Sequence, residues 1–179
     1  FRDGDHPRWL FYIEKGKVKL YKTAEDSREF IIRISGAGEF VGYVELLQDI
    51  PYAESAAVLE ELSVKLIPKT EFLSLVFGNR DVSARFIKML AGHVVDQEQH
   101  LLQLAYHTVR KRVAEALVKV AGERNEPIRM FREDLASLVG TAKETLVRTL
   151  ADFKSEGLID INDGFITLMK RERLLLMPN

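Results

Sequence analysis

The sequence predicts an α+β protein in which a strand-rich N-terminal domain, one long helix and a small helical domain with a β-hairpin follow one another. Three observations support this prediction. Short apolar runs separated by turn residues fill residues 1–78. Residues 81–107 contain no proline and carry apolar side chains at helical spacing. Residues 132–169 combine two short amphipathic helix patterns with a hairpin signal.

The strand-rich part has alternating apolar residues and regular turn signals. Gly16 separates the run Phe11–Ile13 from the alternating Val18 and Leu20, and further runs cover residues 30–34, 55–60 and 63–68. The glycines of residues 36–42 allow tight turns, and Pro68 ends the last run because it cannot continue a sheet interior. A short helix is expected from Thr70 to Phe77, closed by Gly78. Residues 1–78 therefore predict a small barrel or jelly roll.

The long helix is expected from Asp81 to His107. Its apolar positions follow a nearly heptad pattern, which is typical of a helix that packs along a partner helix. We therefore expect a homodimer interface along it, with Gln97 as a polar break that fixes the register; the alternative is a helix lying on its own domain. The predicted interface residues are Phe86, Leu90, Val94, Gln97, Leu101 and Leu104.

His93, His100 and His107 recur every seven residues beside this interface. Two interpretations stay open: a stripe that responds to protons or metal ions, or exposed polar positions of an amphipathic helix, which is the favoured one. Thr108 is the expected N-cap of a new helix from Val109 to Ala121. Residues 79–108 are thus assigned to a dimerisation helix and a hinge.

Residues 132–159 read as two helices joined by a tight turn. Leu135, Leu138 and Val139 share the buried side of the first helix, and Gly140 ends it in a left-handed cap. Thr141 is then expected as the N-cap of the second helix, with Glu144 completing a capping box.

The second helix has two unlike faces. Leu146, Leu150 and Phe153 lie on one side, and Glu144 and Arg148 project from the other. Lys143 and Thr145 flank the first turn. A helix–turn–helix needs this arrangement, because one side anchors the helix while its N-terminal residues reach base edges in the major groove. The alternative is an ordinary solvated face in which Glu144 only caps the helix.

A hairpin is predicted after this helix pair. Two short strand patterns flank the turn residues Asn162, Asp163 and Gly164. Two helices followed by a hairpin are typical of a winged helix–turn–helix domain, here spanning residues 109–179.

Composition bounds the function. The chain has 179 residues, is 46% hydrophobic and contains no cysteine, which excludes thiolate catalysis and cysteine-ligated clusters. It carries no apolar run of membrane-spanning length and no secretory leader, so a cytoplasmic protein without membrane contact is expected. The start at Phe1 suggests that N-terminal residues are missing. The net charge is −1, and residues from Val109 onward hold 13 basic and 11 acidic side chains, so any nucleic-acid contact must rest on a few placed residues.

This order of parts resembles the bacterial transcription regulators of the cyclic-AMP receptor protein/FNR (CRP/FNR) family. The resemblance covers nearly the whole chain. It is strongest over residues 109–166 and is clear at FYIEKGKVKLYK and GEFVG, the glycine-marked segments of the family's jelly-roll sensor domain. Only an opening helix and the first strands of the sensor are absent.

The resemblance implies a homodimer on a palindromic double-stranded DNA operator with G- and C-containing half-sites. Carried over by motif position, Lys143, Glu144 and Arg148 read bases: lysine and arginine reach guanine acceptors, and glutamate accepts from cytosine N4. The positions that hold backbone phosphates are Arg132, Thr141 and Thr145. RNA polymerase is a partner implied by the family.

The expected effector pocket departs from the family pattern. The family's glycine–glutamate pair becomes Gly42 and Tyr43, and its arginine–serine pair becomes Glu54 and Ser55. A carboxylate repels a phosphate, and Gln97 and Glu98 replace the hydroxyls that contact adenine, so cyclic AMP is not expected to bind in the usual way. Glu45 takes the ribose role only if the alignment shifts by two residues.

No cofactor or metal is predicted, and the effector stays unknown. Iron–sulfur sensing needs cysteines, and haem sensing needs axial ligands, whereas the strand region holds only His6. Two alternatives remain: a ligand-independent regulator whose sensor domain is only a dimerising scaffold, and, more distantly, a cupin-type metalloenzyme, which needs more histidines inside the barrel. The preferred interpretation is a regulator and not an enzyme, in which a signal in the barrel shifts the angle at the Thr108 hinge.

Overall fold

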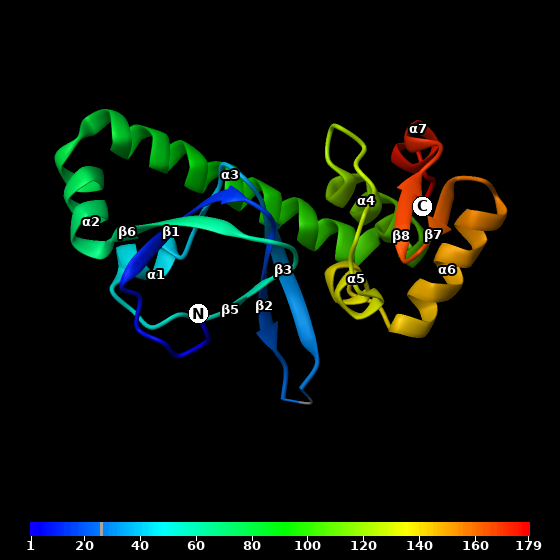
Figure 1. Cartoon of the computed structure of the whole chain (residues 1–179), viewed down its shortest axis with the longest axis horizontal. Helices are drawn as coiled ribbons and strands as arrows, with labels where there is room; N and C mark the ends of the chain where they lie inside the picture. The colour runs from blue at the N-terminus through cyan, green and yellow to red at the C-terminus, as the bar shows by residue number, and fades with distance from the viewer. Residues whose placement is uncertain (26) are drawn as a thin grey trace. The chain divides into compact units, whose positions relative to one another are not determined.

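The computed structural model describes residues 1–25 and 27–179, and Figure 1 traces their helices and strands. The chain divides into two compact units, residues 1–97 and 98–179. The division falls inside the long helix α3 (Arg80–Tyr106), so each unit contains part of this helix.

The N-terminal unit contains two antiparallel three-stranded sheets. The first has the order β4-β1-β6 and the second the order β3-β2-β5. Consecutive strands β1 and β2 lie in different sheets, joined at Gly16, where an added Cβ would meet the Glu61 carbonyl oxygen at 2.2 Å. The strands are β1 (Trp9–Lys15), β2 (Val18–Thr23), β3 (Glu29–Ser35), β4 (Phe40–Val41), β5 (Ser55–Val58) and β6 (Ser63–Pro68). The predicted strand-rich domain is confirmed.

Alternation along the strands builds the core of this unit. One buried cluster consists of Ile13, Val18, Leu20 and Val41, which come from both sheets. Val18 and Leu20 are two residues apart in β2, so they point to the same side of that strand, and Ile13 and Val41 come from the other sheet. The cluster therefore occupies the space between the two sheets.

A second cluster lies where the helices cover this unit. It joins α1 (Tyr43–Gln48) and α2 (Lys69–Gly78) to β1. Phe86 and Leu90 of α3 pack against it. The expected helix from Thr70 to Phe77 is confirmed as α2, but its C-cap is Asn79 and not Gly78. The Asn79 side chain accepts backbone N–H bonds from Asp81 and Val82 at 3.0 and 3.2 Å. Asn79 thus caps the start of α3.

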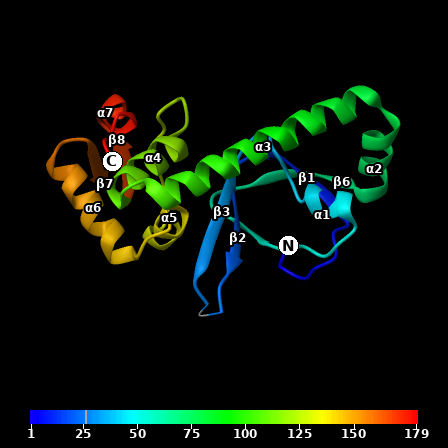
Figure 2. The ribbon, with the colours of Figure 1, turned by 180° about the vertical axis from the view of Figure 1, so that it is seen from behind.

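The C-terminal unit is a helix bundle with a hairpin, and Figure 2 shows the same ribbon from behind. Its buried core includes Leu117, Leu135, Leu150, Phe153 and Ile166. The elements are α4 (Val109–Ala121), α5 (Arg132–Val139), α6 (Lys143–Ser155), β7 (Ile159–Asn162), β8 (Phe165–Leu168) and α7 (Arg171–Leu175). Helix α4 has the predicted bounds; α7 was not expected from the sequence.

The junction between α3 and α4 is tied by side-chain hydrogen bonds. Thr108 caps α4 by accepting from the Lys111 N–H, as predicted. Asn179 donates to the Tyr106 carbonyl oxygen at 2.8 Å and accepts from the Thr108 N–H at 2.9 Å. One side chain therefore bonds to the backbone on both sides of the junction.

Candidate DNA-binding site and sensor pocket

A left-handed glycine makes the turn between α5 and α6. Gly140 has φ 70° and ψ 48°, and its N–H bonds to the Ser137 carbonyl oxygen. The next N–H, that of Thr141, bonds to the Ala136 carbonyl oxygen at 3.0 Å. These two bonds satisfy the carbonyl groups at the end of α5, as in a Schellman cap.

The predicted capping box is wrong. The N-cap of α6 is Ala142, which has no side-chain capping bond, and not Thr141. The reason is that the N–H of Thr141 completes the cap of α5, so the turn uses one residue more than the sequence pattern suggested. An ion pair between Lys143 and Glu133 instead connects the starts of the two helices.

The two faces of α6 are as predicted. Leu146, Leu150 and Phe153 are at most 2% exposed, whereas Lys143, Glu144 and Arg148 are exposed. Thr145 is half-buried, and its carbonyl oxygen accepts a bond from the buried Thr149 hydroxyl at 2.9 Å. Helix α6 is thus anchored along one side and presents charged side chains on the other.

Arg132 opens α5. Its Nη1 donates to the Met130 carbonyl oxygen at 3.3 Å, and burial lowers the pKa of its guanidinium, which stays charged at neutral pH. Of the six predicted DNA-contacting residues, it comes from the first helix and the other five come from the turn and from α6.

The predicted hairpin follows α6, and its turn has two residues, because Asn162 pairs with Phe165. Asp163 and Gly164 both have positive φ, 48° and 84°, as a type I′ turn requires. Arg129 lies over the ring of Phe165 at 5.7 Å from its centroid, and Ile128 bonds to Ile166 in a short bridge. The wing is therefore attached to the segment that precedes α5.

In the sensor pocket, Tyr43 is a core residue. It is 3% exposed and belongs to the cluster beneath α3. Its hydroxyl accepts a bond from Arg33 Nη1 at 3.2 Å and is hydrogen-bonded to His93 Nδ1. Arg33 Nη1 also lies 3.2 Å from His93 Nε2. The position expected to hold a ribose is thus filled by contacts within the protein.

The remaining predicted pocket residues lie around Gly42. Gly42 has φ 80°, and an added Cβ would lie 3.2 Å from the Tyr52 hydroxyl oxygen. Burial, together with the charges of Glu45 and Asp5, raises the pKa of Tyr52 to about 12. Ser55 Oγ accepts a bond from the Asp3 N–H at 3.0 Å.

Two carboxylates share this region. Glu45 is 6% exposed. Burial, followed by repulsion from Glu45, raises the pKa of Glu54, while the cations Arg33 and Lys22 oppose the rise. A bound phosphate would add a further negative charge beside these two groups.

The favoured interpretation of the three histidines is wrong, because none of them is an exposed polar position. All three are half-buried. His107 pairs with Glu115 at 3.0 Å, and burial, followed by the charge of Lys119, lowers the pKa of His100. Burial, followed by the charge of Arg33, lowers the pKa of His93.

Two protein families match this chain, one in its N-terminal part and one in its C-terminal part. A family described as "Cyclic nucleotide-binding domain" matches residues 1–79, and one described as "Crp-like helix-turn-helix domain" matches residues 111–177. The Cyclic AMP receptor protein of Thermus thermophilus is 29% identical over 177 residues, covering 98% of this chain and 81% of that protein. The Anaerobic regulatory protein of Bacillus subtilis is 27% identical, covering 97% and 77%.

The chain belongs to the CRP/FNR family. The fold agrees: the structure of FixK2 from Bradyrhizobium japonicum superposes with a TM-score of 0.84 at 22% identity, covering 99% of this chain and 91% of that one. The chain is therefore a DNA-binding transcription regulator of the CRP/FNR family, with a sensor-type N-terminal domain and a helix–turn–helix domain.

For this CRP/FNR regulator, sequence reasoning missed Arg33 and the contact of His93 with the sensor. Arg33 interrupts an otherwise apolar run, FIIRI, and that interruption was the available signal. The partners Tyr43 and His93 are 10 and 60 residues away along the chain, so only the fold brings them together.

Residues 1–25 and 27–179 contain no helix with the length and apolarity needed to cross a bilayer. Within the same ranges, no group of three or more potential metal-binding side chains is gathered in one place.

Proposed function

We propose that this CRP/FNR regulator acts as a homodimer that recognises a palindromic DNA operator by inserting α6 into the major groove. The observation that carries the proposal is the pair of unlike faces on α6. Glu144 and Arg148 are exposed, whereas Leu146 and Phe153 on the opposite side are completely buried. A helix anchored in this way presents its N-terminal residues to base edges.

Lys143, Glu144 and Arg148 are the proposed base readers. Arg148 offers a fork of donors to guanine O6 and N7, and Glu144 accepts from cytosine N4, which gives half-sites that contain G and C. Lys143 reaches guanine as a single point charge. Its ion pair with Glu133 must open when it does so.

Arg132, Thr141 and Thr145 are the proposed phosphate contacts, which position the protein on the duplex but do not select a sequence. Thr141 lies in the turn, and its N–H is already used by α5. Its hydroxyl is therefore the group available for a phosphate.

The proposed dimer interface is an apolar stripe along α3, rotated from the predicted one. Phe86 and Leu90 pack on the core of their own sensor domain, so they do not lie in this interface. Val94 and Leu101 from the original prediction are 54% and 65% exposed. We define the α3 stripe as Ile87, Val94, Val95, Leu101 and Leu102, which are all at least half exposed. Gln97 and Leu104 lie beside it.

The proposed domains are a sensor (residues 1–78), a dimerisation helix with a hinge (79–108) and a winged helix–turn–helix domain (109–179). The nucleotide pocket is degenerate on this proposal, because Tyr43 occupies it and Glu54 faces Glu45. The regulator works in the cytoplasm and contacts RNA polymerase. The second candidate is a ligand-independent regulator, favoured by the Arg33–Tyr43–His93 contacts that fill the sensor without a guest.

The test is the effect of Arg148→Ala on sequence preference. Binding sites are selected from a random duplex library with the unchanged protein, and the affinity of both proteins is then measured for the selected site with each base pair replaced in turn. We expect a loss of about 1–3 kcal/mol on the selected site and relaxed preference at one base pair per half-site. Arg85→Ala, an exposed arginine on α3, is the matched control and should change neither. Equal weakening on every duplex would refute base reading by Arg148.

A further inference from the structure

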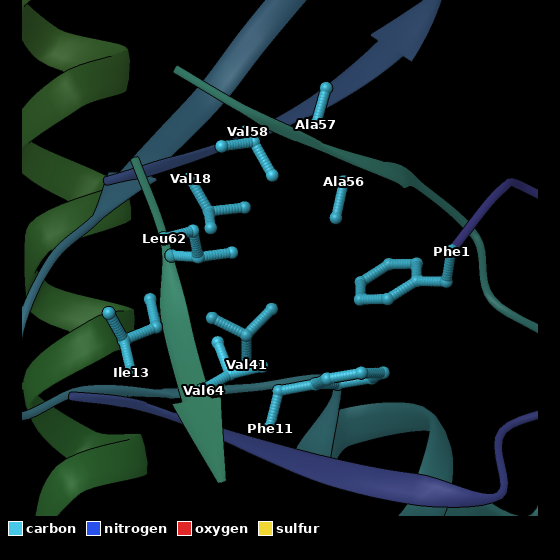
Figure 3. Close-up of a pocket in the computed structure, with 10 residues that line it drawn as sticks. All are labelled: Phe1, Phe11, Ile13, Val18, Val41, Ala56, Ala57, Val58, Leu62 and Val64. Atoms are coloured by element: carbon cyan, nitrogen blue, oxygen red, sulfur yellow. The ribbon is translucent and has the colours of Figure 1, made fainter. Parts of the chain in front are cut away.

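Three consecutive basic residues, Arg110, Lys111 and Arg112, lie in the first turn of α4. None of the residues of this turn, all of which the structure describes, is acidic, and cations oppose the positive end of a helix dipole. The run is therefore unfavourable for α4 on its own, so its charges need partners in other elements of the C-terminal unit. The sensor differs in this respect, because the space between its two sheets is lined by apolar side chains such as Val41 and Leu62 (Figure 3).

Arg110 contacts the C-terminal end of α6. Its Nη2 lies 2.7 and 2.5 Å from the two carboxylate oxygens of Glu156, the C-cap residue of α6. Its guanidinium lies 4.7 Å from the ring centroid of Phe153, which is completely buried. An exposed ion pair alone contributes little, but the cation over a buried ring adds a second, directional contact. Arg110 therefore ties the last turn of α6 to the first turn of α4.

Arg112 bonds to the C-terminal ends of two other helices. Its Nη1 donates to the Leu104 carbonyl oxygen in the last turn of α3 at 3.0 Å, and its Nη2 donates to the Gly140 carbonyl oxygen at the end of α5 at 3.3 Å. Carbonyl groups at a helix C-terminus lack an intrahelical partner and carry partial negative charge, so a guanidinium between them is favourable. The Leu104 carbonyl is such a group, because the Thr108 N–H, four residues on, bonds to the Asn179 side chain.

The two arginines together contact both ends of α6. Arg112 bonds to the turn before this helix, and Arg110 bonds to the residue that ends it. Arg112 also bonds to the end of α3, in the part of that helix that belongs to the same compact unit. The proposed recognition helix is thus connected to the proposed dimerisation helix by side chains from a single helical turn.

We propose that Arg110 and Arg112, the α4 arginines, are positioning residues that set the distance between half-sites which the dimer accepts. They hold α6 at a fixed angle to the end of α3, so the two α6 helices of a dimer stay at a fixed separation. The inference rests on the proposed function, because only a dimer on a palindrome has two half-sites to separate.

The spacing of the half-sites is a sensitive measure of this angle. The half-sites of a helix–turn–helix dimer lie about 10–10.5 base pairs apart, which is one turn of DNA. One extra base pair therefore moves a half-site by about 3.4 Å along the duplex and turns it by roughly 35° about the axis. Two α6 helices that are held rigidly cannot follow both changes, whereas loosely held ones can. Neither arginine needs to touch a base for this effect.

Four variants separate geometry from charge. Arg112→Met and Arg110→Met keep a long side chain and remove every donor. Arg112→Lys keeps the charge but loses the planar fork that bonds to two carbonyl groups at once. Arg124→Met removes an exposed arginine from the segment after α4 and is the matched control. Arg110→Met also keeps the test decisive if Arg112→Met does not fold.

The experiment uses the whole chain and the palindrome selected from the random library, with its half-sites moved apart or together by one base pair. For the unchanged protein and Arg124→Met, either change should weaken binding at least about tenfold, as expected when one half-site is misplaced. For Arg112→Met, Arg112→Lys and Arg110→Met, the loss should be about threefold or less, with base preference inside each half-site unchanged. Circular dichroism at the binding temperature checks that each variant is folded. Folded variants that keep the full loss would overturn the inference.

Salt dependence distinguishes the α4 arginines from phosphate contacts. Removing a cation that binds phosphate lowers the slope of log affinity against log salt by about one, whereas we expect the slope to stay constant in Arg112→Met. A lower slope, with the spacing dependence restored in Arg112→Lys, would also overturn the inference. A chain that selects no palindrome, or binds it as a monomer, would instead contradict the proposed function, so the two failures are distinguishable.

Discussion

Phe153 is the residue that anchors the recognition helix. Its side chain is completely buried, and the guanidinium of Arg110 lies 4.7 Å from its ring centroid. We expect Phe153→Ala to lower the free energy of unfolding by about 3–5 kcal/mol, because it removes a large buried ring and leaves a cavity. Urea unfolding measures this loss. Arg148→Ala, on the exposed face of the same helix, should stay within about 0.5 kcal/mol of the unchanged protein.

His93 links stability to pH. Burial, followed by the charge of Arg33, lowers its pKa, while Glu39 and Asp96 act in the opposite direction. Below its ordinary pKa of about 6.5 the unfolded chain binds more protons at this position than the folded protein, so stability falls as pH falls through this range. We expect His93→Gln to reduce the change in thermal midpoint between about pH 7.5 and 5.5.

The measured quantity is the difference in the pH dependence of the thermal midpoint between the unchanged protein and His93→Gln. His100 also has a lowered pKa, so part of the pH dependence remains in the variant. An unchanged slope in His93→Gln would show that the ring is protonated equally well in the folded and unfolded states.

At the residue scale, periodicity predicted the faces of α6 because side-chain direction on a helix follows from spacing alone. Leu146, Glu144 and Arg148 lie where the sequence placed them. The capping role of Thr141 could not be predicted, because it depended on how many residues the cap of α5 consumes. The Arg33–Tyr43–His93 contacts depend on the packing of distant segments, which a single sequence does not reveal.

At the element scale, the turn between α5 and α6 depends on a left-handed residue. Gly140 has φ 70°. We expect Gly140→Ala to lower the free energy of unfolding by about 1–2 kcal/mol, because a Cβ is disfavoured in this conformation. Gly140→Asn should cost less, since asparagine enters the left-handed region more readily. Urea unfolding of both variants tests this order; equal losses would indicate steric crowding and not backbone conformation.

Long or strongly marked elements were predictable and short ones were not. Helix α4 has its predicted bounds because Thr108 caps it and an amphipathic pattern fills it. Helices α1 and α7 have six and five residues, too few to show a helical period, and the two-residue strand β4 is shorter still. The dimer face of α3 stays a prediction, because heptad spacing does not tell which partner covers each residue: Phe86 and Leu90 pack on the sensor.

At the scale of the whole molecule, the proposed function requires pairing of two protomers through the α3 stripe. We expect Leu101→Asp to halve the molar mass in solution and to weaken operator binding at least tenfold, because a charge is placed in an apolar interface and one protomer reads only one half-site. Analytical ultracentrifugation and operator titration measure the two effects. Phe77→Asp, at a residue of α2 that is 75% exposed, is the control and should leave the molar mass unchanged.

The ion pair between Lys143 and Glu133 has a consequence for how the regulator would search a genome. On the proposed function, Lys143 gives up this carboxylate partner when it moves to an arbitrary phosphate, which lowers the free energy gained on random duplex by a small amount, because the pair is exposed. Each encounter with an unrelated stretch would then be brief. The protein would dissociate slowly only from sites where guanine acceptors replace Glu133 as the partner of Lys143. It would therefore scan more DNA per unit of time.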